Sequence, residues 1–176
     1  DLRQIDDLFG GRIQTLASNA FNIAAATKDA DLLVGSVLIP GALTPKLVTE
    51  AMVKTMKPGS AIVDVAIDQG GCIEPTAKHG ATYHDKPTFK YPVNGGEVVC
   101  YSVGNMPGAV ARTSTFTLTN ATMPYMVDLA NKGWKKACQD DKALARGINT
   151  YDGKVYFKGV SDALGYELHC TCDILK

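Results

Sequence analysis

Short apolar runs alternate with segments of helical periodicity along the first two-thirds of the chain. The apolar runs, which predict buried strands, are 12–16, 31–38, 61–67 and 97–103. The segments with helical spacing are 2–9, 19–28 and 44–56. In the last of these, Thr44 is placed to cap the helix and Pro45 to occupy its first position. Strands separated by helices predict an α/β fold, a doubly wound parallel sheet with helices on both faces.

The last third of the chain changes character, because no further strand–helix repeats follow. Apolar spacing over 114–132 predicts a long helix that ends at Gly133, and one or two short helices are expected over 134–146. We therefore predict two domains, residues 1–111 and residues 112–176.

Composition and charge argue against several classes of function. The 176 residues carry 18 lysines and arginines against 18 aspartates and glutamates, so no basic excess indicates binding to nucleic acid or to an anionic membrane surface. No apolar run approaches the roughly 20 residues of a membrane-spanning helix. Five scattered cysteines, an odd number, favour free thiols in a cytoplasmic protein over a disulfide framework. His169, Cys170 and Cys172 lie close together in sequence without a second ligand cluster, so we expect no metal site.

Three predicted strands end in loops that contain glycine or proline, at 39–42, 68–71 and 105–108. In a parallel sheet the carboxyl ends of the strands share one edge, where ligands bind. Asp68 follows seven mostly apolar residues, and its carboxylate indicates a charged or proton-transferring group that faces a substrate. Capping of the following turn is the alternative. Asp64 lies inside the same run, and we expect it to be structural, held by backbone donors or a loop hydroxyl.

The glycine fingerprint of dinucleotide-binding domains, Gly-x-Gly-x-x-Gly between a strand and a helix, does not occur in the chain. Two explanations are open: the chain binds no nucleotide, or the fingerprint lies upstream of Asp1. The chain opens directly on an amphipathic helix, which favours a piece of a longer protein.

Four ordered blocks of sequence carry a resemblance to a known family. They are LLVGSVLIPGALTPKLV, MKPGSAIVDVAIDQGGCIE, VGNMPGAVARTSTFTLTNATMPY and LANKGWKKAC. Over nearly the whole chain the sequence resembles the L-alanine dehydrogenase family, which passes a hydride from L-alanine to NAD and releases pyruvate and ammonium. The resemblance implies a partial Rossmann-like NAD-binding domain over 1–111, because the family's glycine loop precedes the segment that matches Asp1. It implies that 112–176 is a C-terminal helical part of the substrate domain.

The resemblance also implies roles for individual residues. Asp68 corresponds to the catalytic carboxylate beside the nicotinamide ring and the reacting carbon of the substrate. Ser18 is expected beside the adenine-ribose end of NAD. The other residues expected to line the cofactor cleft, together with Asp68, are Val37, Leu38, Val65, Ala66, Ile67, Val103, Asn105 and Met106.

The family's catalytic histidine, and the lysine and arginine that bind the substrate carboxylate, belong to its N-terminal lobe. We therefore expect His79, His84 and His169 to be surface residues. We also expect this chain alone to bind NAD weakly and to lack dehydrogenase activity, with L-alanine and pyruvate as substrates of the longer protein. The family implies a homo-oligomer, and apolar surface left bare by a missing half-domain predicts association between copies.

Two alternative functions are open. The NAD-binding subunit of proton-translocating transhydrogenase shares the domain plan, but a Glu-Arg-Gly-Gly-like segment is expected there in place of 68–71. A non-catalytic Rossmann-like module would explain the absent fingerprint, but such a module has no need for a carboxylate in the crevice.

The stretch 72–96 shows little periodicity and predicts irregular structure. Within it, 88–96 looks longer than the family pattern, which predicts a surface insertion.

Overall fold

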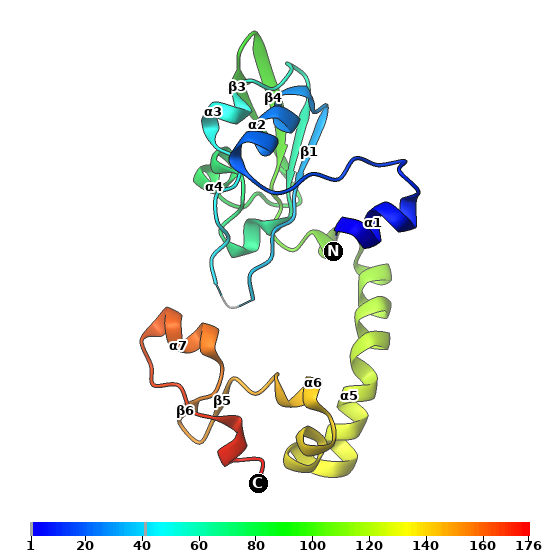
Figure 1. The fold of residues 1–176 in the computed structure, drawn as a ribbon, viewed down its shortest axis with the longest axis vertical. Helices are drawn as coiled ribbons and strands as arrows, with labels where there is room; N and C mark the ends of the chain where they lie inside the picture. The colour runs from blue at the N-terminus through cyan, green and yellow to red at the C-terminus, as the bar shows by residue number, and fades with distance from the viewer. Residues whose placement is uncertain (1, 41) are drawn as a thin grey trace. The chain divides into compact units, whose positions relative to one another are not determined.

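The computed structural model describes residues 2–40 and 42–176 of the chain. These residues form two compact units (Figure 1). The first unit contains the residues up to Leu38 together with Thr44–Gly104, and the second contains Ile39–Leu43 and Asn105–Lys176. The chain therefore passes between the units after Leu38, after Leu43 and after Gly104.

A four-stranded sheet forms the centre of the first unit (Figure 1). In spatial order the strands are β1 (Leu32–Gly35), β2 (Ala61–Asp64), β4 (Gly96–Tyr101) and β3 (Thr88–Val93). Strands β1, β2 and β4 are parallel, whereas β3 pairs antiparallel with β4. The three parallel strands coincide with three of the apolar runs, so the predicted α/β fold with a parallel sheet is confirmed.

Helices pack against one face of this sheet (Figure 1). They are α2 (Ala20–Asp29), α3 (Glu50–Val53) and α4 (Glu74–His79). Alternate strand residues point toward them, so that Ile62, Val98 and Cys100 are buried in one cluster with Val53 and Ile73. The alternation of side chains along each strand therefore builds the core on this face.

The opposite face of the sheet is bare in the part of the chain that the structure describes. Leu32, Val34 and Val99 are 59%, 52% and 40% exposed. The first helix, α1 (Leu2–Phe9), buries none of its residues. A doubly wound sheet has helices on both faces, and the described residues cover only one of them.

The predicted helix over 44–56 is wrong in its first half. The segment 44–48 is not helical, and Val48 forms a parallel bridge with Ile73 beyond the loop that follows β2. Its backbone N–H groups donate to carbonyls of that loop, and these long-range bonds replace the helical ones. Thr49 caps α3 by accepting from the Met52 N–H at 3.3 Å, so the cap is not Thr44.

The predicted strand at 12–16 is also wrong. These residues form a bend and irregular backbone, and none of them pairs with a strand that the structure describes. Without a neighbouring strand the apolar residues there have no ladder to join, and Ile13 and Leu16 are exposed.

The prediction of irregular structure over 72–96 is wrong, because this stretch contains α4 and β3. The segment 88–96, predicted to be a surface insertion, is not an irregular loop. It forms the edge strand and the tight turn of a hairpin in which Asn94 and Gly95 join β3 to β4. Gly95 has a φ of 87°, a conformation that glycine adopts without steric cost.

A long helix, α5 (Ala111–Asp140), begins the larger part of the second unit (Figure 1). Gly133 interrupts it with φ 72° and ψ 159°, which are not helical values. The prediction of a long helix that ends at Gly133 is therefore confirmed, and a second helical segment continues to Asp140.

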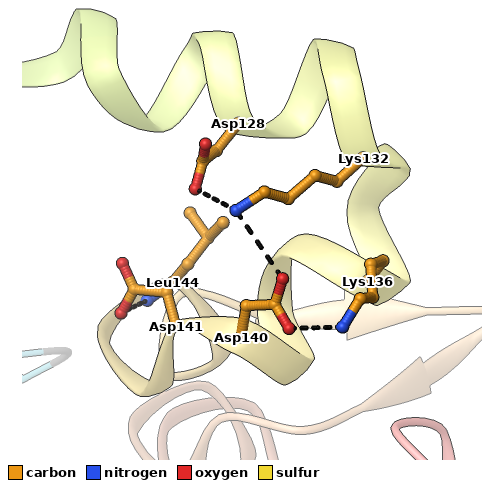
Figure 2. A network of polar contacts seen from close by, with 6 residues as sticks. All are labelled: Asp128, Lys132, Lys136, Asp140, Asp141 and Leu144. Atoms are coloured by element: carbon orange, nitrogen blue, oxygen red, sulfur yellow. Dashed lines mark hydrogen bonds and ion pairs between the residues drawn. The ribbon is translucent and has the colours of Figure 1, made fainter.

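A charged network crosses this interruption (Figure 2). The Nζ atom of Lys132 lies 2.9 Å from Asp128 Oδ2 and 3.6 Å from Asp140 Oδ2. Lys136 Nζ lies 2.6 Å from Asp140 Oδ1. Hydrogen bonding to Asp128 raises the pKa of Lys132, and hydrogen bonding from Lys136 lowers the pKa of Asp140. The network links the two helical segments through one shared carboxylate.

Short elements make up the rest of the second unit. They are η2 (Met106–Val110), α6 (Lys142–Ala145), β5 (Thr150–Tyr151), β6 (Lys154–Val155), α7 (Lys158–Leu164) and η3 (Thr171–Asp173). The end of α5 and α6 confirm the short helices predicted over 134–146. Asp152 and Gly153, with φ 48° and 71°, form the tight turn between β5 and β6.

The expectation of free thiols is wrong for two of the five cysteines. Cys170 and Cys172 form a disulfide, and their Cα atoms are 5.2 Å apart, a separation that this bond requires. The remaining cysteines, Cys72, Cys100 and Cys138, are free and buried.

The histidines differ in exposure. His79 and His84 are exposed as predicted, but the side chain of His169 is only 27% exposed and tilts against the ring of Tyr156. No group of three or more metal-binding side chains is arranged around a common point among the residues that the structure describes. Within the same residues, no helix combines the length and the apolar character that crossing a membrane requires.

Candidate functional site

The carboxyl ends of β1, β2 and β4 lie at one edge of the sheet, because the three strands are parallel neighbours. The loop after β2 forms a 3-10 helix, η1 (Val65–Gln69), which carries Asp68. A Cβ atom placed on Gly104, beyond the end of β4, would lie 3.0 Å from Asp68 Oδ1. The Asp68 carboxylate therefore lies against the backbone that follows β4, at the edge where ligands bind in open parallel sheets.

Asp64 anchors the loop that carries Asp68. Its side chain is completely buried, and its carboxylate accepts hydrogen bonds from three backbone N–H groups and one hydroxyl. The donors are Ala66 N at 3.2 Å, Cys72 N at 3.1 Å, Ile73 N at 3.2 Å and Thr76 Oγ1 at 2.5 Å. A buried carboxylate needs such donors to offset its lost hydration. The prediction that Asp64 is structural, held by backbone donors and a loop hydroxyl, is confirmed.

The two glycines after Gln69 serve this arrangement. Gly70 ends η1 with φ 88°, and its N–H donates to Ile67 O at 2.9 Å. Gly71 has φ 73°, and a Cβ atom there would lie 2.8 Å from Asp64 Oδ2. Glycine is the only amino acid that can adopt this φ and also lie so close to the Asp64 carboxylate, because it has no Cβ atom. The close contact of Gly71 is therefore with the protein's own buried carboxylate.

The segment 44–48 holds the outer side of the same turn. Lys46 Nζ donates to Gly70 O at 2.6 Å and to Gly71 O at 2.7 Å. The Thr44 N–H donates to Gln69 O at 3.0 Å. The carbonyls that follow Asp68 thus have partners from a segment more than twenty residues earlier in the chain.

A cavity of about 380 Å³ lies beside β1. Its walls are mainly apolar and include Ile23 of α2, Leu33 of β1 and Val37, while Ser18 contributes a hydroxyl. Its volume and lining are typical of a site for a small organic ligand. Two of the residues expected to contact NAD, Ser18 and Val37, line this one cavity.

Cys72 also lines this cavity, although it is only 2% exposed. Burial, followed by the nearby charge of Asp64, raises the pKa of its thiol to about 11. The thiol is therefore protonated near neutral pH, and Cys72 is a packing residue and not a nucleophile.

Two buried oxygen atoms beside the Asp68 turn have no hydrogen-bond partner within the described part of the chain. They are Thr44 Oγ1 and Gln69 Oε1, and the backbones of these two residues are joined by a hydrogen bond. Buried polar atoms without partners are rare in folded proteins.

The other residues expected to contact NAD fall into three groups. Leu38 and Val65 are exposed, at 68% and 46%. The side chains of Ala66, Ile67 and Val103 are almost completely buried, which leaves mainly their backbone atoms for a ligand. The last two, Asn105 and Met106, belong to the second unit, where Asn105 has φ 54° and precedes η2.

Sequence reasoning missed two contributors to this turn. Lys46 has no sequence signal of its own, because its partners are carbonyls far along the chain. Thr76 follows Pro75 at the start of α4 and gives Asp64 its shortest hydrogen bond. The only sequence signal for these contacts was the Gly70–Gly71 pair, which indicates a tight turn that approaches another part of the chain closely.

Comparison with known proteins places this arrangement in a family. The family model described as alanine dehydrogenase/PNT, C-terminal domain, matches residues 1–158. The chain is 59% identical over 166 residues to an alanine dehydrogenase of Bacillus subtilis (strain 168), which covers 94% of the chain and 42% of that protein. It is 56% identical over 162 residues to an alanine dehydrogenase of Methanococcus maripaludis, covering 92% of the chain and 42% of that protein.

A solved structure titled L-alanine dehydrogenase superposes with a TM-score of 0.74 at 46% identity. The match covers 93% of this chain and 43% of that one. The chain thus spans less than half the length of the relatives it matches. Its sheet, its site-bearing loops and its sequence agree on one conclusion: the chain belongs to the alanine dehydrogenase/PNT C-terminal domain family.

Proposed function

We propose that this chain supplies the NAD-binding part of an NAD-dependent L-alanine dehydrogenase, which converts L-alanine reversibly to pyruvate and ammonium. The observation that carries the proposal is the identity of more than half of the aligned residues to proteins named alanine dehydrogenase, over more than nine-tenths of the chain. The carboxylate of Asp68 at the ligand-binding edge of the sheet supports it.

The domain assignment is part of the proposal. We assign residues 1–111 to the nucleotide-binding domain and residues 112–176 to the substrate domain of the longer protein. Ser18 and Val37 would hold the adenine-ribose end of NAD in the cavity beside β1. Leu38, Val65, Asp68 and the backbone around Ala66 would follow the cofactor toward the nicotinamide end, with Ile67 and Val103 beside them. The family resemblance also assigns Asn105 and Met106 to the cofactor.

NAD, when bound, supplies the acceptor for the hydride that leaves C2 of L-alanine. The balanced reaction consumes L-alanine, NAD⁺ and water, and it yields pyruvate, ammonium, NADH and a proton. Positive charge develops on C2 and on the amino nitrogen as the hydride leaves, and the Asp68 carboxylate would stabilise this charge. The same carboxylate would accept a proton from the water that replaces the amino group.

A chimeric enzyme tests the proposal. This chain replaces the matched 42% of the Bacillus subtilis alanine dehydrogenase, and NADH formation is measured with L-alanine and NAD. We expect the chimera to oxidise L-alanine, and we expect an Asp68→Asn variant to lose about 100-fold or more in kcat. Asp31→Asn is the matched control, because that carboxylate is exposed near the amino end of β1.

Two outcomes would contradict the proposal. One is a folded chimera that binds NAD without oxidising L-alanine, which would favour the transhydrogenase-type or purely binding alternatives. The other is full activity in the Asp68→Asn variant. The chain alone is expected to show no alanine-dependent NADH formation and only weak binding of NAD.

A further inference from the structure

Four consecutive carbonyls follow Asp68 in the chain, and all four accept hydrogen bonds from residues 44–48. The donor–acceptor pairs are Thr44 N to Gln69 O at 3.0 Å, Lys46 Nζ to Gly70 O at 2.6 Å and to Gly71 O at 2.7 Å, and Leu47 N and Val48 N to Cys72 O at 2.9 and 3.2 Å. Backbone N–H groups bind the first and the last of the four carbonyls, those of Gln69 and Cys72. The two central contacts come from one side chain, the ammonium group of Lys46.

The local sequence explains why a side chain does this. Pro45 has no N–H group, so the backbone of 44–48 cannot offer a donor at that point of the pairing. The ammonium group of Lys46 provides donors in its place, and its third contact is Thr44 O at 3.4 Å. Charge-assisted hydrogen bonds of this kind are shorter and stronger than neutral ones.

Lys46 is unusual among the lysines of the chain in using its charge on the backbone. No carboxylate lies within ion-pair distance of it in the described residues, whereas Lys57, Lys78 and Lys90 each pair with an acidic side chain. Gly70 and Gly71, its partners, are the residues with the most conformational freedom in the turn. Lys46 therefore restrains the part of the turn whose backbone is the most flexible.

The turn that carries Asp68 is thus held from two sides. Inside, the Asp64 carboxylate accepts from the N–H group of Ala66 within η1 and from those of Cys72 and Ile73 after Gly71. Outside, Lys46 binds the carbonyls of Gly70 and Gly71. An anion on the N–H groups and a cation on the carbonyls leave the backbone after Asp68 with little freedom.

We propose that Lys46 is a positioning residue for Asp68, which acts by fixing the Gly70–Gly71 carbonyls and does not touch the substrate. This inference rests on the catalytic role proposed for Asp68. Lys46, in the loop before α3, would help to keep the Asp68 carboxylate in its reactive position. This matters because small misplacements of a catalytic group strongly reduce turnover.

The first test uses the chain alone and measures amide hydrogen exchange. Lys46→Met keeps the length of the side chain and removes its charge and its donors. We expect exchange at Gly70, Gly71 and Cys72 to become about tenfold faster in this variant, because these amides share the turn that Lys46 restrains. Lys57→Met is the matched control, since Lys57 pairs with the exposed Asp31 at the far end of β1, and it should leave those amides unchanged.

The second test uses the chimera with the Bacillus subtilis protein, at temperatures well below the unfolding midpoint of each variant. Lys46→Met is expected to lower kcat about tenfold while KM for NAD stays within about twofold, the pattern of a misplaced catalytic group. Lys46→Arg, which keeps a cation with several donors, is expected to retain most of the kcat. The Lys57→Met chimera should match the parent chimera.

The outcomes separate this inference from the proposed function. An inactive parent chimera that is folded overturns the catalytic proposal and this inference with it. An active parent with unchanged kcat in Lys46→Met overturns the inference alone, even if that variant is less stable. Unchanged amide exchange in the turn, or a Lys46→Arg variant as slow as Lys46→Met, would also overturn it.

Discussion

Asp68-Gln69-Gly70-Gly71 shows how much a short motif reveals at the scale of single residues. Its sequence indicates a carboxylate at the end of a strand over 61–67 and a tight turn after it. The turn is present, but β2 already ends at Asp64, and Asp68 lies in the 3-10 helix η1. The motif does not reveal what the glycines approach. Gly71 lies against Asp64 Oδ2, which comes seven positions earlier in the chain and points back only because the loop folds over it. The partner is set by tertiary packing.

The role of Gly71 leads to a prediction with an internal control. Gly71 and Gly59 both have positive φ, at 73° and 83°, but nothing lies within 4 Å of a Cβ on Gly59. Gly59→Ala should therefore lose about 1 kcal/mol of stability from the backbone conformation alone. Gly71→Ala should lose about 2–3 kcal/mol or more, because its methyl group also meets the buried Asp64 carboxylate.

Urea unfolding of the two variants, followed by circular dichroism, provides the comparison. Equal losses of unfolding free energy for Gly59→Ala and Gly71→Ala would show that the Asp64 contact does not restrict position 71.

Elements were predictable where the signal is local. The apolar runs locate β1, β2 and β4, and Gly133 marks the break in α5. The hairpins at Asn94–Gly95 and Asp152–Gly153 were not predicted, although both residue pairs are typical of two-residue hairpin turns. The helix predicted from Thr44 failed for a different reason, because its donors are taken by carbonyls of residues 69–72.

The break in α5 allows a test at the scale of one element. Gly133 has φ 72° and ψ 159°, a region that only glycine adopts readily, whereas Gly165 at the end of α7 has φ 70° and ψ 24°. Neither would meet a neighbour with an added Cβ. Gly133→Ala should therefore cost up to about 3 kcal/mol and Gly165→Ala about 1 kcal/mol.

Thermal unfolding of both variants measures this difference. A Gly133→Ala variant as stable as Gly165→Ala would show that α5 runs through this position without the break.

At the scale of the whole molecule, the described residues leave apolar surface exposed. Large apolar side chains on α1 and on the bare face of the sheet are between 39% and 75% exposed. They are Leu2, Ile5, Leu8, Phe9, Leu32, Val34 and Val99. An amphipathic helix and a strand of this kind ordinarily pack against further chain, and the relatives have more than half of their length outside the matched region.

We predict that the chain, expressed by itself, associates through this surface. Light scattering should show dimers or larger species. A Leu32→Lys/Val34→Lys double variant should shift the distribution toward monomer, whereas Leu164→Lys, at an exposed leucine of the second unit, should not. A strictly monomeric parent chain would contradict the prediction.

The sequence by itself determined the fold class, the three parallel strands, the long helix and the position of Asp68 after β2, because these depend on apolar runs and on turn residues that act over a few positions. Family membership was equally accessible, since long ordered blocks of sequence carry it. Only the tertiary structure decided that residues 44–48 bind the loop after β2 instead of forming a helix, and that Asp64 and Lys46 hold the Asp68 turn from opposite sides. Each of these depends on contacts between segments distant in the chain, which local periodicity does not encode.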